Sequence, residues 1–289
     1  MKTIRTIEEM RDELKKVNGQ SVGYVPTMGY LHEGHLSLVK RARKENDVVV
    51  MSIFVNPLQF GPNEDFERYP RDEARDKRLA EQHGVDLLFI PTVDVMYPNE
   101  MGIEMKVTKG TDVLCGRSRP GHFDGVATVL TKFFHIIQPD RAYFGLKDAQ
   151  QFAVVNTLVS HFNFPIQLVG LPTVREEDGL AKSSRNVYLS EEERKEAKTL
   201  YEALKLGQKM VMDGEKDVDL IVQKVKTYIT EHMNATIDYV EMLSYPELNE
   251  IKRVDEQVIL AVAIYYKNAR LIDNIILSPD GKQVETIIR

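Results

Sequence analysis

Two histidines stand three residues apart in PTMGYLHEGH, residues 26–35. The segment follows an apolar strand-like run and opens a helical pattern. Beyond the carboxyl end of a parallel strand, the free N–H groups and partial positive charge of the next helix favour a phosphate ligand. Gly29 and Gly34 let the backbone approach a ligand closely, and His32 and His35 could face the same anion. A zinc site is the weaker interpretation, because the metalloprotease motif HExxH has one more residue between its histidines.

A second polar segment, YFGLKDAQQ at residues 143–151, also ends a strand-like run and opens a helical pattern. Lys147 could pair with a phosphate there as a point charge. Gln151 lies one helical turn further on and would point the same way. Asp148 is suited both to contacting a ligand and to capping the helix, and the sequence leaves both roles open.

A third segment, DGLAKSSRN at residues 178–186, combines a glycine, two hydroxyls and two cations. Serine hydroxyls and arginine donate hydrogen bonds to phosphate oxygens, so this composition fits a flexible clamp that closes on a triphosphate. An ordinary linker between two domains is the alternative interpretation.

Two further segments are polar near strand ends. Asn56 and Gln59 are neutral hydrogen-bonding residues suited to hydroxyls and a carboxylate, although Asn56-Pro57 is also ordinary turn chemistry. A basic loop, RSRPGHF at residues 117–123, precedes an apolar helical pattern.

Apolar, β-branched runs alternate with helical patterns from residue 7 to residue 171. This alternation predicts an α/β fold with a parallel sheet that is buried on both faces. The predicted strands are Val22–Pro26, Asp47–Val55, Val85–Ile90, Arg141–Phe144 and Ile166–Leu171. The predicted helices are Ile7–Val17, Leu36–Lys44, Asp72–His83, Val126–Ile137 and Ala149–Phe162.

The pattern changes after Pro172. Two charged helical patterns, Ser190–Met212 and Asp217–Met233, come first, and Ser190 with Glu193 forms a capping box. Three strand-like runs follow, so we predict a smaller, mostly antiparallel α+β domain and divide the chain into residues 1–174 and 175–289. The predicted strands are Ile237–Met242, Val258–Tyr266 and Arg270–Leu277.

Composition narrows the function further. The chain has 289 residues, 43% of them hydrophobic and 28% charged, which suffices for a sizeable core and rules out wholesale disorder. The net charge of −6 argues against a general binder of nucleic acid or anionic membranes. The one cysteine, Cys115, excludes an intrachain disulfide. The N-terminal segment is not a signal peptide, and the longest apolar run is too short to span a bilayer, so we expect a cytoplasmic protein.

Taken together, these segments resemble the pantothenate synthetase (pantoate–β-alanine ligase) family, and they follow its order over nearly the whole chain. PTMGYLHEGH resembles the family's HxGH nucleotide signature, which is related to that of class I aminoacyl-tRNA synthetases and nucleotidyltransferases. The resemblance implies a Rossmann-like nucleotide-binding domain with the site at its strand ends, and a C-terminal domain that acts as a lid. The other matching segments are FVNPLQF, RYPRD, RPGHFDGV, YFGLKDAQQ, PTVREEDGLAKSSRN and RLIDNI.

The resemblance also implies a reaction. ATP and (R)-pantoate form pantoyl adenylate and pyrophosphate, and β-alanine then attacks the adenylate to give pantothenate and AMP. Adenylation is needed because oxide is a poor leaving group. ATP is then a substrate, Mg²⁺ bridges phosphate oxygens, and Asp76 matches a metal position of the family. The family is typically a homodimer joined through its N-terminal domains.

Residue roles carry over from the same resemblance. His32, His35 and Lys147 would contact the phosphates, with His35 as the proton donor. Ser183, Ser184 and Arg185 would form a clamp of the KMSKS type. The ATP site would comprise Met28, Gly29, Tyr30, Leu31, His32, Glu33, Gly34, His35, Gly145, Leu146, Lys147, Asp148, Val174, Lys182, Ser183, Ser184 and Arg185. Pantoate and β-alanine would be bound by Gln59, Gln151, Asn56, Tyr69 and Arg119.

Two positions depart from the family pattern. Lys182 replaces a methionine, and either adds a cation beside the phosphates or points to solvent, while Leu146 stands where Glu or Gln is commoner. Three other functions share some features of the sequence. A nucleotidyltransferase would not need two glutamines spaced for a hydroxy acid, an aminoacyl-tRNA synthetase would carry an anticodon-binding module, and a nucleotide sensor would release no pyrophosphate.

Overall fold

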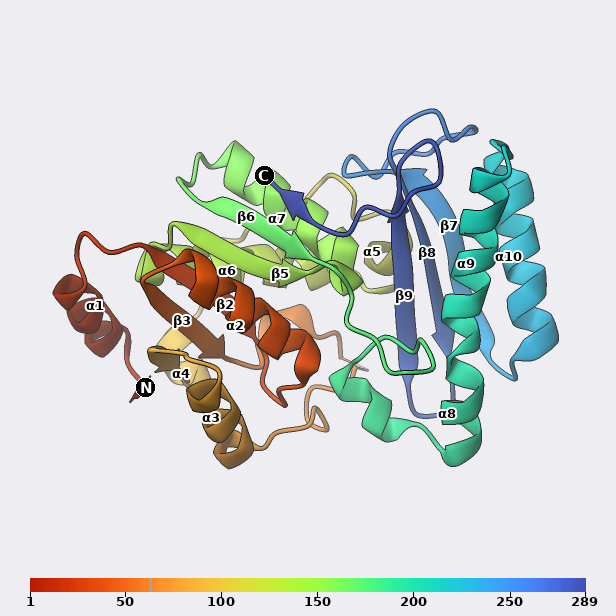
Figure 1. The fold of residues 1–289 in the computed structure, drawn as a ribbon. Coiled ribbons are helices and arrows are strands. Elements are labelled where there is room, and N and C mark those ends of the chain that lie inside the picture. The colour runs from red at the N-terminus through yellow and green to blue at the C-terminus, as the bar shows by residue number, and fades with distance from the viewer. Residues whose placement is uncertain (63) are drawn as a thin grey trace.

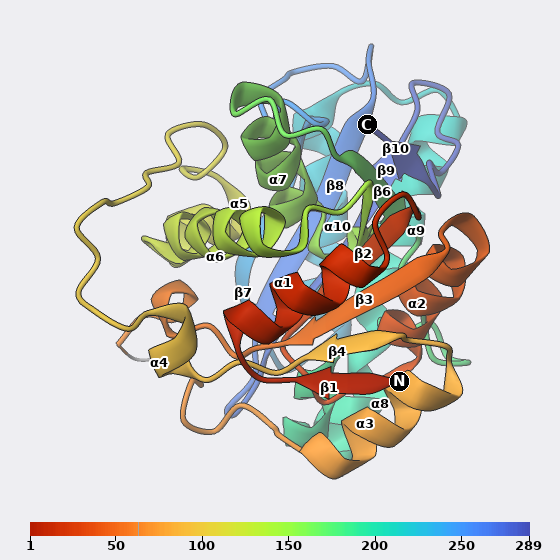
Figure 2. The same cartoon turned by 90° about the vertical axis from the view of Figure 1, so that its left-hand side faces the viewer.

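Six parallel strands and one short antiparallel strand form the larger sheet of the computed structural model, which describes residues 1–62 and 64–289. Their spatial order is β1-β4-β3-β2-β5-β6-β10 (Figure 1 and Figure 2). The α/β fold predicted from the alternating sequence pattern is therefore confirmed. The strands are Lys2–Ile4 (β1), Val22–Thr27 (β2), Val48–Ile53 (β3), Leu87–Phe89 (β4), Arg141–Gly145 (β5), Gln167–Leu171 (β6) and Ile287–Ile288 (β10).

Helices cover both faces of this sheet, because its strands are apolar on both sides (Figure 2). Within β2, Tyr24 packs in the core beneath one set of helices, and the next residue, Val25, packs in the core beneath the other. The helices on the first face are Ile7–Lys16 (α1), His122–Ile137 (α6) and Ala149–His161 (α7). Those on the second face are Glu33–Glu45 (α2) and Glu73–Gln82 (α3).

The order of the strands reverses between β2 and β5. From β2 the chain adds β3 and then β4 on one side, and later adds β5 and then β6 on the other. At such a reversal, the loops that leave the two central strands diverge and open a crevice beyond the carboxyl ends of those strands. Residues 28–35 follow β2 and residues 146–148 follow β5, so two of the predicted segments flank this crevice.

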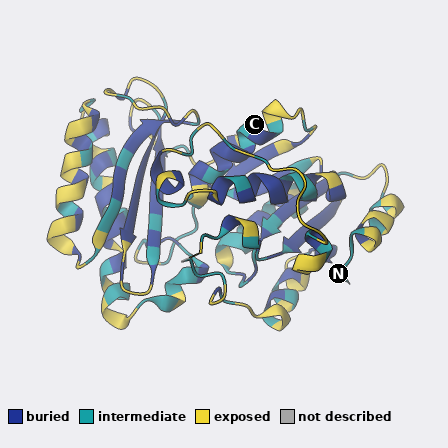
Figure 3. Ribbon diagram, turned by 180° about the vertical axis from the view of Figure 1, so that it is seen from behind, coloured by how far each residue is buried: buried dark blue, intermediate teal, exposed yellow. Residues whose placement is uncertain are grey.

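The second sheet is antiparallel, with the order β7-β8-β9. Val262 in β8 packs in the core shared with α9 and α10, whereas Ala261 and Ala263 join the core of the first sheet. Both sheets are accordingly buried between layers whose outer helix faces are exposed (Figure 3). The strands are Thr236–Ser244 (β7), Val258–Tyr265 (β8) and Arg270–Leu277 (β9), and the helices are Glu191–Ala197 (α8), Thr199–Met212 (α9) and Val218–His232 (α10).

Short elements connect these layers. They include two α-helical segments, Val93–Met96 (α4) and Leu114–Ser118 (α5). The 3₁₀ turns are Pro57–Gln59 (η1), Leu146–Asp148 (η2) and Ser184–Tyr188 (η3). None of the helices in the described residues is long and apolar enough to cross a membrane.

Two details differ from the sequence-based expectation. The helix expected over Ser190–Met212 is divided at Lys198, whose carbonyl accepts the N–H of Tyr201 in a tight turn that starts α9. The capping box at its start is confirmed. β10 returns to pair with β6, so the C-terminal end of the chain lies on the first sheet. The division at residues 174 and 175 stays a prediction, and we add that β10 belongs with the first sheet.

Candidate active site

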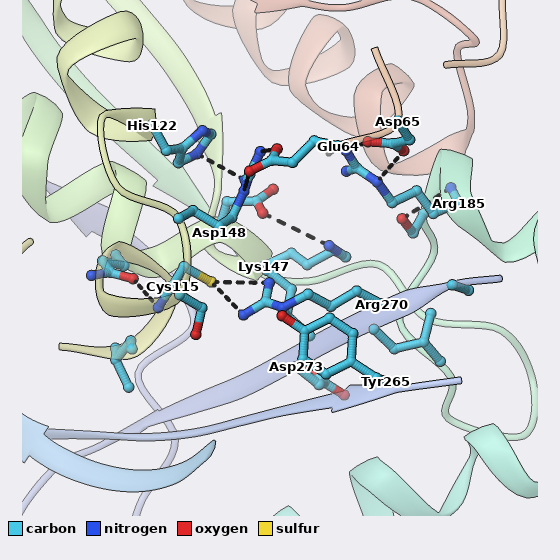
Figure 4. A pocket seen from close by; sticks show the side chains of 18 of the residues that line it. Glu64, Asp65, Cys115, His122, Lys147, Asp148, Arg185, Tyr265, Arg270 and Asp273 are labelled. Carbon is cyan, nitrogen blue, oxygen red and sulfur yellow. Dashed lines mark hydrogen bonds and ion pairs between the residues drawn. The ribbon is translucent and has the colours of Figure 1, made fainter. Parts of the chain in front are cut away.

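Two adjoining cavities, of about 220 and 640 Å³, contain most of the predicted site residues. The smaller cavity lies at the carboxyl ends of β2 and β5. The larger cavity, which Figure 4 shows, lies between the two sheets. The clamp segment and the loop after η1 line both of them. The residues that line both cavities are Arg119, His122, Lys147, Asp148, Gln151, Ser183 and Arg185.

A buried carboxylate shapes the turn that follows β2. Both oxygens of Asp76 accept backbone hydrogen bonds, from the N–H groups of Tyr30 and Leu31, each at 2.7 Å. The turn has positive φ at Gly29 and Tyr30. A Cβ at Gly29 would lie 2.9 Å from Ile53 and 3.0 Å from Asp76, so the conformation and the close packing both favour glycine. Asp76 thus connects α3 to the signature segment.

Backbone N–H groups hold both histidines of this turn in one tautomer. His32 is the N-cap of α2, where its Nδ1 accepts the N–H of Gly34 at 3.1 Å. The Nδ1 of His35 accepts the N–H of His32 at 3.3 Å. Burial, together with nearby Lys147, lowers the pKa of His32 to about 4. Burial also holds the pKa of His35 well below its ordinary value. Both rings are therefore neutral at pH 7 and carry their proton on Nε2, ready to donate to an anion.

The second sheet positions the loop after β5. The side chain of Asn274 in β9 donates to the carbonyls of Leu146 and Lys147, at 3.1 and 2.7 Å. Lys147 is largely buried, and its Nζ lies 3.8 Å from Asp148. Leu146 packs in the core, so near to Gly170 that a Cβ there would meet it at 2.7 Å. The departure at Leu146 is therefore a packing residue in this chain.

The clamp segment is held by contacts with the second sheet and with the histidine turn of the first. Asp273 in β9 accepts two hydrogen bonds from Arg175, at 2.6 and 3.0 Å, just before the segment begins. At its other end, Ser183 caps η3 by accepting the N–H of Arg185. Ser184 donates to the carbonyl of Tyr30 at 3.4 Å, which joins the clamp to the histidine turn.

Lys182 lies in the smaller cavity and is paired with acidic residues. Its Nζ lies 2.9 Å from Glu33 and 3.2 Å from Glu176. Of the two alternatives for this departure, the structure therefore favours a cation held beside the site over one that points to solvent.

On the opposite side of the smaller cavity, Asn56 supports Gln59. The amide of Asn56 is almost fully buried and is engaged by Gly125 and Tyr97, besides donating to Gln59 Oε1 at 3.2 Å. Its Oδ1 also accepts the N–H of Leu58 at 3.3 Å, which caps η1 and is the turn role that the sequence left open. The Nε2 of Gln59 lies 3.3 Å from the sulfur of Met28. Gln151 and Tyr69 also line the smaller cavity.

His122 is a site residue to which the sequence gave no role. Its Nδ1 lies 2.8 Å from the carbonyl of Gln59, and its Nε2 lies 3.1 Å from Arg119. Because arginine only donates, Nε2 is the acceptor and Nδ1 carries the proton. Burial and the charge of Arg119 lower the pKa of His122 to about 4, which agrees with this neutral form. The sequence signal that could have identified His122 as a site residue was its place in RPGHFDGV, a segment that matches the family.

Not every predicted site residue lines the cavities. Glu33 is exposed and paired with Lys182, whereas Leu31 and Leu146 are buried in the core. Among residues 1–62 and 64–289, no group of three or more His, Cys, Asp or Glu side chains is arranged to hold a metal. The contacts of Asp76 fit a loop-shaping role and do not fit the predicted metal ligand. The predicted residues outside the cavity walls are Gly29, Tyr30, Leu31, Glu33, Leu146 and Asp76.

Comparison with known proteins agrees with this geometry. The sequence model of the family described as Pantoate-beta-alanine ligase matches residues 2–276. The chain belongs to the pantoate–β-alanine ligase family. A pantothenate synthetase from Geobacillus sp. (strain WCH70) is 59% identical over 273 residues, which make up 94% of this chain and 97% of that protein.

Two solved structures of the family match the whole fold. Pantothenate synthetase from Thermus thermophilus has a TM-score of 0.91 at 47% identity, over 95% of this chain and 99% of the other. The pantoate–β-alanine ligase from Francisella tularensis, complexed with Beta-gamma ATP and Beta-alanine, has a TM-score of 0.79 at 32% identity, over 96% and 99%. The family resemblance seen in the sequence is thereby confirmed.

Proposed function

We propose that the protein catalyses, in these two cavities, the ATP-dependent condensation of (R)-pantoate with β-alanine through pantoyl adenylate. The observation that carries this proposal is the meeting of three segments at the crevice: the histidine turn after β2, Lys147 after β5, and the clamp residues 183–185. The family's reaction needs these three kinds of donor around a triphosphate. The Francisella tularensis relative, with Beta-gamma ATP and Beta-alanine, supports both molecules as ligands.

The α- and β-phosphates of ATP would lie between His32, His35 and Lys147. The two neutral imidazoles donate from Nε2, and Lys147 supplies positive charge. Donors that are fixed before the substrate arrives need no rearrangement as charge develops on the leaving pyrophosphate. The low pKa of His35 favours hydrogen-bond donation over the transfer of its proton. Ser183, Ser184 and Arg185 would hold the phosphates from the clamp side.

Pantoate would occupy the side of the smaller cavity near Gln59 and Gln151. Its hydroxyls suit the neutral amides, and its carboxylate would then face the α-phosphate that it attacks. The carboxylate oxygen displaces pyrophosphate, and the amine of β-alanine later displaces AMP from the acyl carbon. Arg119 and Tyr69 would lie at the end of the site that pantoate and β-alanine share, where Arg119 would face the carboxylate of pantoate. Enclosure between the two units would protect the adenylate from water.

Three further expectations belong to this proposal. Mg²⁺ would enter with ATP and be held by phosphate oxygens and water, because Mg²⁺ keeps much of its hydration shell. No step is assigned to a metal bound at Asp76, whose oxygens already accept two backbone N–H groups. Family membership supports a homodimer and a cytoplasmic location.

Pyrophosphate release before any β-alanine is added tests the proposal. The enzyme, ATP and Mg²⁺ are mixed with and without (R)-pantoate. We expect a stoichiometric burst that requires pantoate and becomes steady turnover when β-alanine is added. Nucleotide binding with no pyrophosphate from any mixture would refute the ligase and leave a nucleotide sensor.

Substitution of Gln59 tests the position of pantoate. We expect Gln59→Ala to raise the KM for pantoate by about tenfold, because a buried hydrogen bond of roughly 1–2 kcal/mol is lost. The KM for ATP should change much less. Steady-state kinetics with each substrate varied in turn would measure both constants. A larger loss for ATP would show that pantoate lies elsewhere.

A further inference from the structure

Two consecutive acidic residues hold Arg119 and Arg185, the arginines that line both cavities. Asp65 accepts two hydrogen bonds from Arg185, from Nε at 2.8 Å and from Nη2 at 2.9 Å. Glu64 accepts from Arg119, whose Nε lies 3.0 Å from Oε1 and whose Nη2 pairs with Oε2. Figure 4 shows Glu64, Asp65 and Arg185 along one edge of the cavity. Both pairs use the planar fork that a guanidinium also offers to a phosphate or a substrate carboxylate.

The four groups are partly buried and charged. The side chains are between 17% and 27% exposed, so solvent screens these pairs less than it screens surface ones. Burial alone would raise the pKa values of Glu64 and Asp65. The paired arginines outweigh burial, and both pKa values lie below the ordinary range. Each arginine is therefore neutralised by a carboxylate of the protein itself.

The loop that carries these carboxylates spans the two sides of the site. Phe60 packs edge-on against Phe66 and Tyr69, with ring centroids 5.4 and 6.0 Å apart. Arg185 lies over the ring of Tyr69, at 5.4 Å. Glu64 reaches Arg119, just beyond α5, and Asp65 reaches Arg185 in η3. One loop thus contacts cations from two distant parts of the chain.

We propose that Glu64 and Asp65 form an acidic clasp, which occupies Arg119 and Arg185 until the anionic groups of the substrates displace it. The proposal rests on the function proposed above, in which Arg185 faces the triphosphate and Arg119 faces the carboxylate end. A triphosphate carries more charge than one aspartate, so it competes successfully for Arg185. Lys147 is not held in this way, because its Nζ lies 3.8 Å from the carboxylate of Asp148, which is beyond hydrogen-bonding distance.

The clasp makes binding selective for ligands with two separate anionic groups. A nucleotide triphosphate releases Arg185 from Asp65, and a hydroxy-acid carboxylate releases Arg119 from Glu64. An uncharged analogue of pantoate cannot compete with Glu64. Because residues 64 and 65 are adjacent, release of one arginine also loosens the loop around the other. Glu64 and Asp65 are therefore positioning residues that set affinity and selectivity and take no part in the chemical step.

Isosteric amides test the clasp by removing the competing charge. We expect Asp65→Asn to lower the Kd of α,β-methylene-ATP with Mg²⁺ by about three- to tenfold, and Glu64→Gln to lower the Kd of pantoate similarly. Isothermal titration calorimetry measures both. Glu241→Gln is the matched control, because it also removes a carboxylate from an arginine pair, with Arg117, but neither residue lines the cavities. That control should leave both Kd values unchanged.

An unchanged or raised Kd in folded Asp65→Asn and Glu64→Gln would overturn the clasp. Thermal unfolding confirms that each variant is folded, and Asp65→Ser replaces Asp65→Asn if that variant is not. The proposed function is tested separately by the wild-type protein. Binding of α,β-methylene-ATP and pantoate-dependent pyrophosphate release there would uphold it even where the clasp fails.

Discussion

The histidine turn and the clamp segment contact the same cavity but are built differently. The turn, residues 28–35, is held within the first unit by short-range backbone bonds, by neutral imidazoles and by Asp76. The clamp, residues 178–186, and Arg175 just before it are held largely by ion pairs that reach across the molecule, to Asp273, Glu33 and Asp65. Hydrogen bonds to backbone N–H groups keep the turn ready for phosphate, whereas ion pairs between side chains can change partners when an anion arrives.

Removal of the His35 side chain tests the role of the turn and should have the largest effect on the reaction rate. We expect His35→Ala to reduce pantoate-dependent pyrophosphate release by about 10²–10³-fold, because a fixed donor to the developing charge is lost. The fold should persist. His135→Ala, an exposed histidine on α6, is the control and should retain full activity. A near-wild-type rate in His35→Ala would show that the turn does not stabilise the leaving group.

Asp76→Asn should have the next largest effect, because an amide nitrogen would face a backbone N–H. We expect a rate loss of about 10–100-fold from the displaced turn and a lower free energy of unfolding by about 1–3 kcal/mol. Initial rates and urea unfolding measure the two. The Mg²⁺ concentration for half-maximal activity should not change. A several-fold rise in that concentration would restore Asp76 as a metal ligand.

Asp273→Asn tests the clamp side. The substitution leaves Arg175 largely buried without its charge partner, and breaking such a pair typically costs about 3–5 kcal/mol of stability. We expect the KM for ATP to rise by about tenfold while kcat falls less, because the clamp loses one of its anchors. Equal losses in kcat and kcat/KM would show instead that the clamp acts in the transition state alone.

The smallest effect concerns pH. The folded pKa values of His32 and His122 lie near 4, below the ordinary 6.5, so the unfolded chain binds more protons between these values. Their stabilisation is complete above pH 6.5 and falls as pH drops toward 4. We expect wild type to lose more stability between pH 7 and 5 than His122→Asn, by about 2 kcal/mol, in urea unfolding. An inflection of kcat/KM near pH 6.5 would contradict a neutral His32.

The strands with long apolar runs and the helices with a regular spacing of apolar residues were predictable from the sequence. β2, β3, β5 and the helices α2, α3 and α6 lie within a few residues of the predicted ranges, and so do the three strands of the second sheet. β1 and β10 were missed, because two or three residues give no periodicity and their pairing depends on β4 and β6. α2 begins three residues earlier than predicted, because His32 serves as an unusual N-cap.

The same limit applies to the site. The polar segments after β2 and β5 were identified because their place at strand ends has a physical meaning. The contact of Asp76 with Tyr30 joins residues 46 positions apart, and no local pattern reports it. Glu64 and Asp65 resemble solvated loop residues in the sequence, and only the fold brings Arg119 and Arg185 to them.

The two outermost strands of the large sheet are its shortest. β1 covers one side of β4, and β10 covers one side of β6, with three and two residues. A long open strand is a template on which another chain can add, which leads to aggregation. Here the two edge strands come from residues near the two ends of the chain, and their short length leaves little open strand for such addition. Neither border therefore offers a long stretch of free backbone on which another chain could extend the sheet.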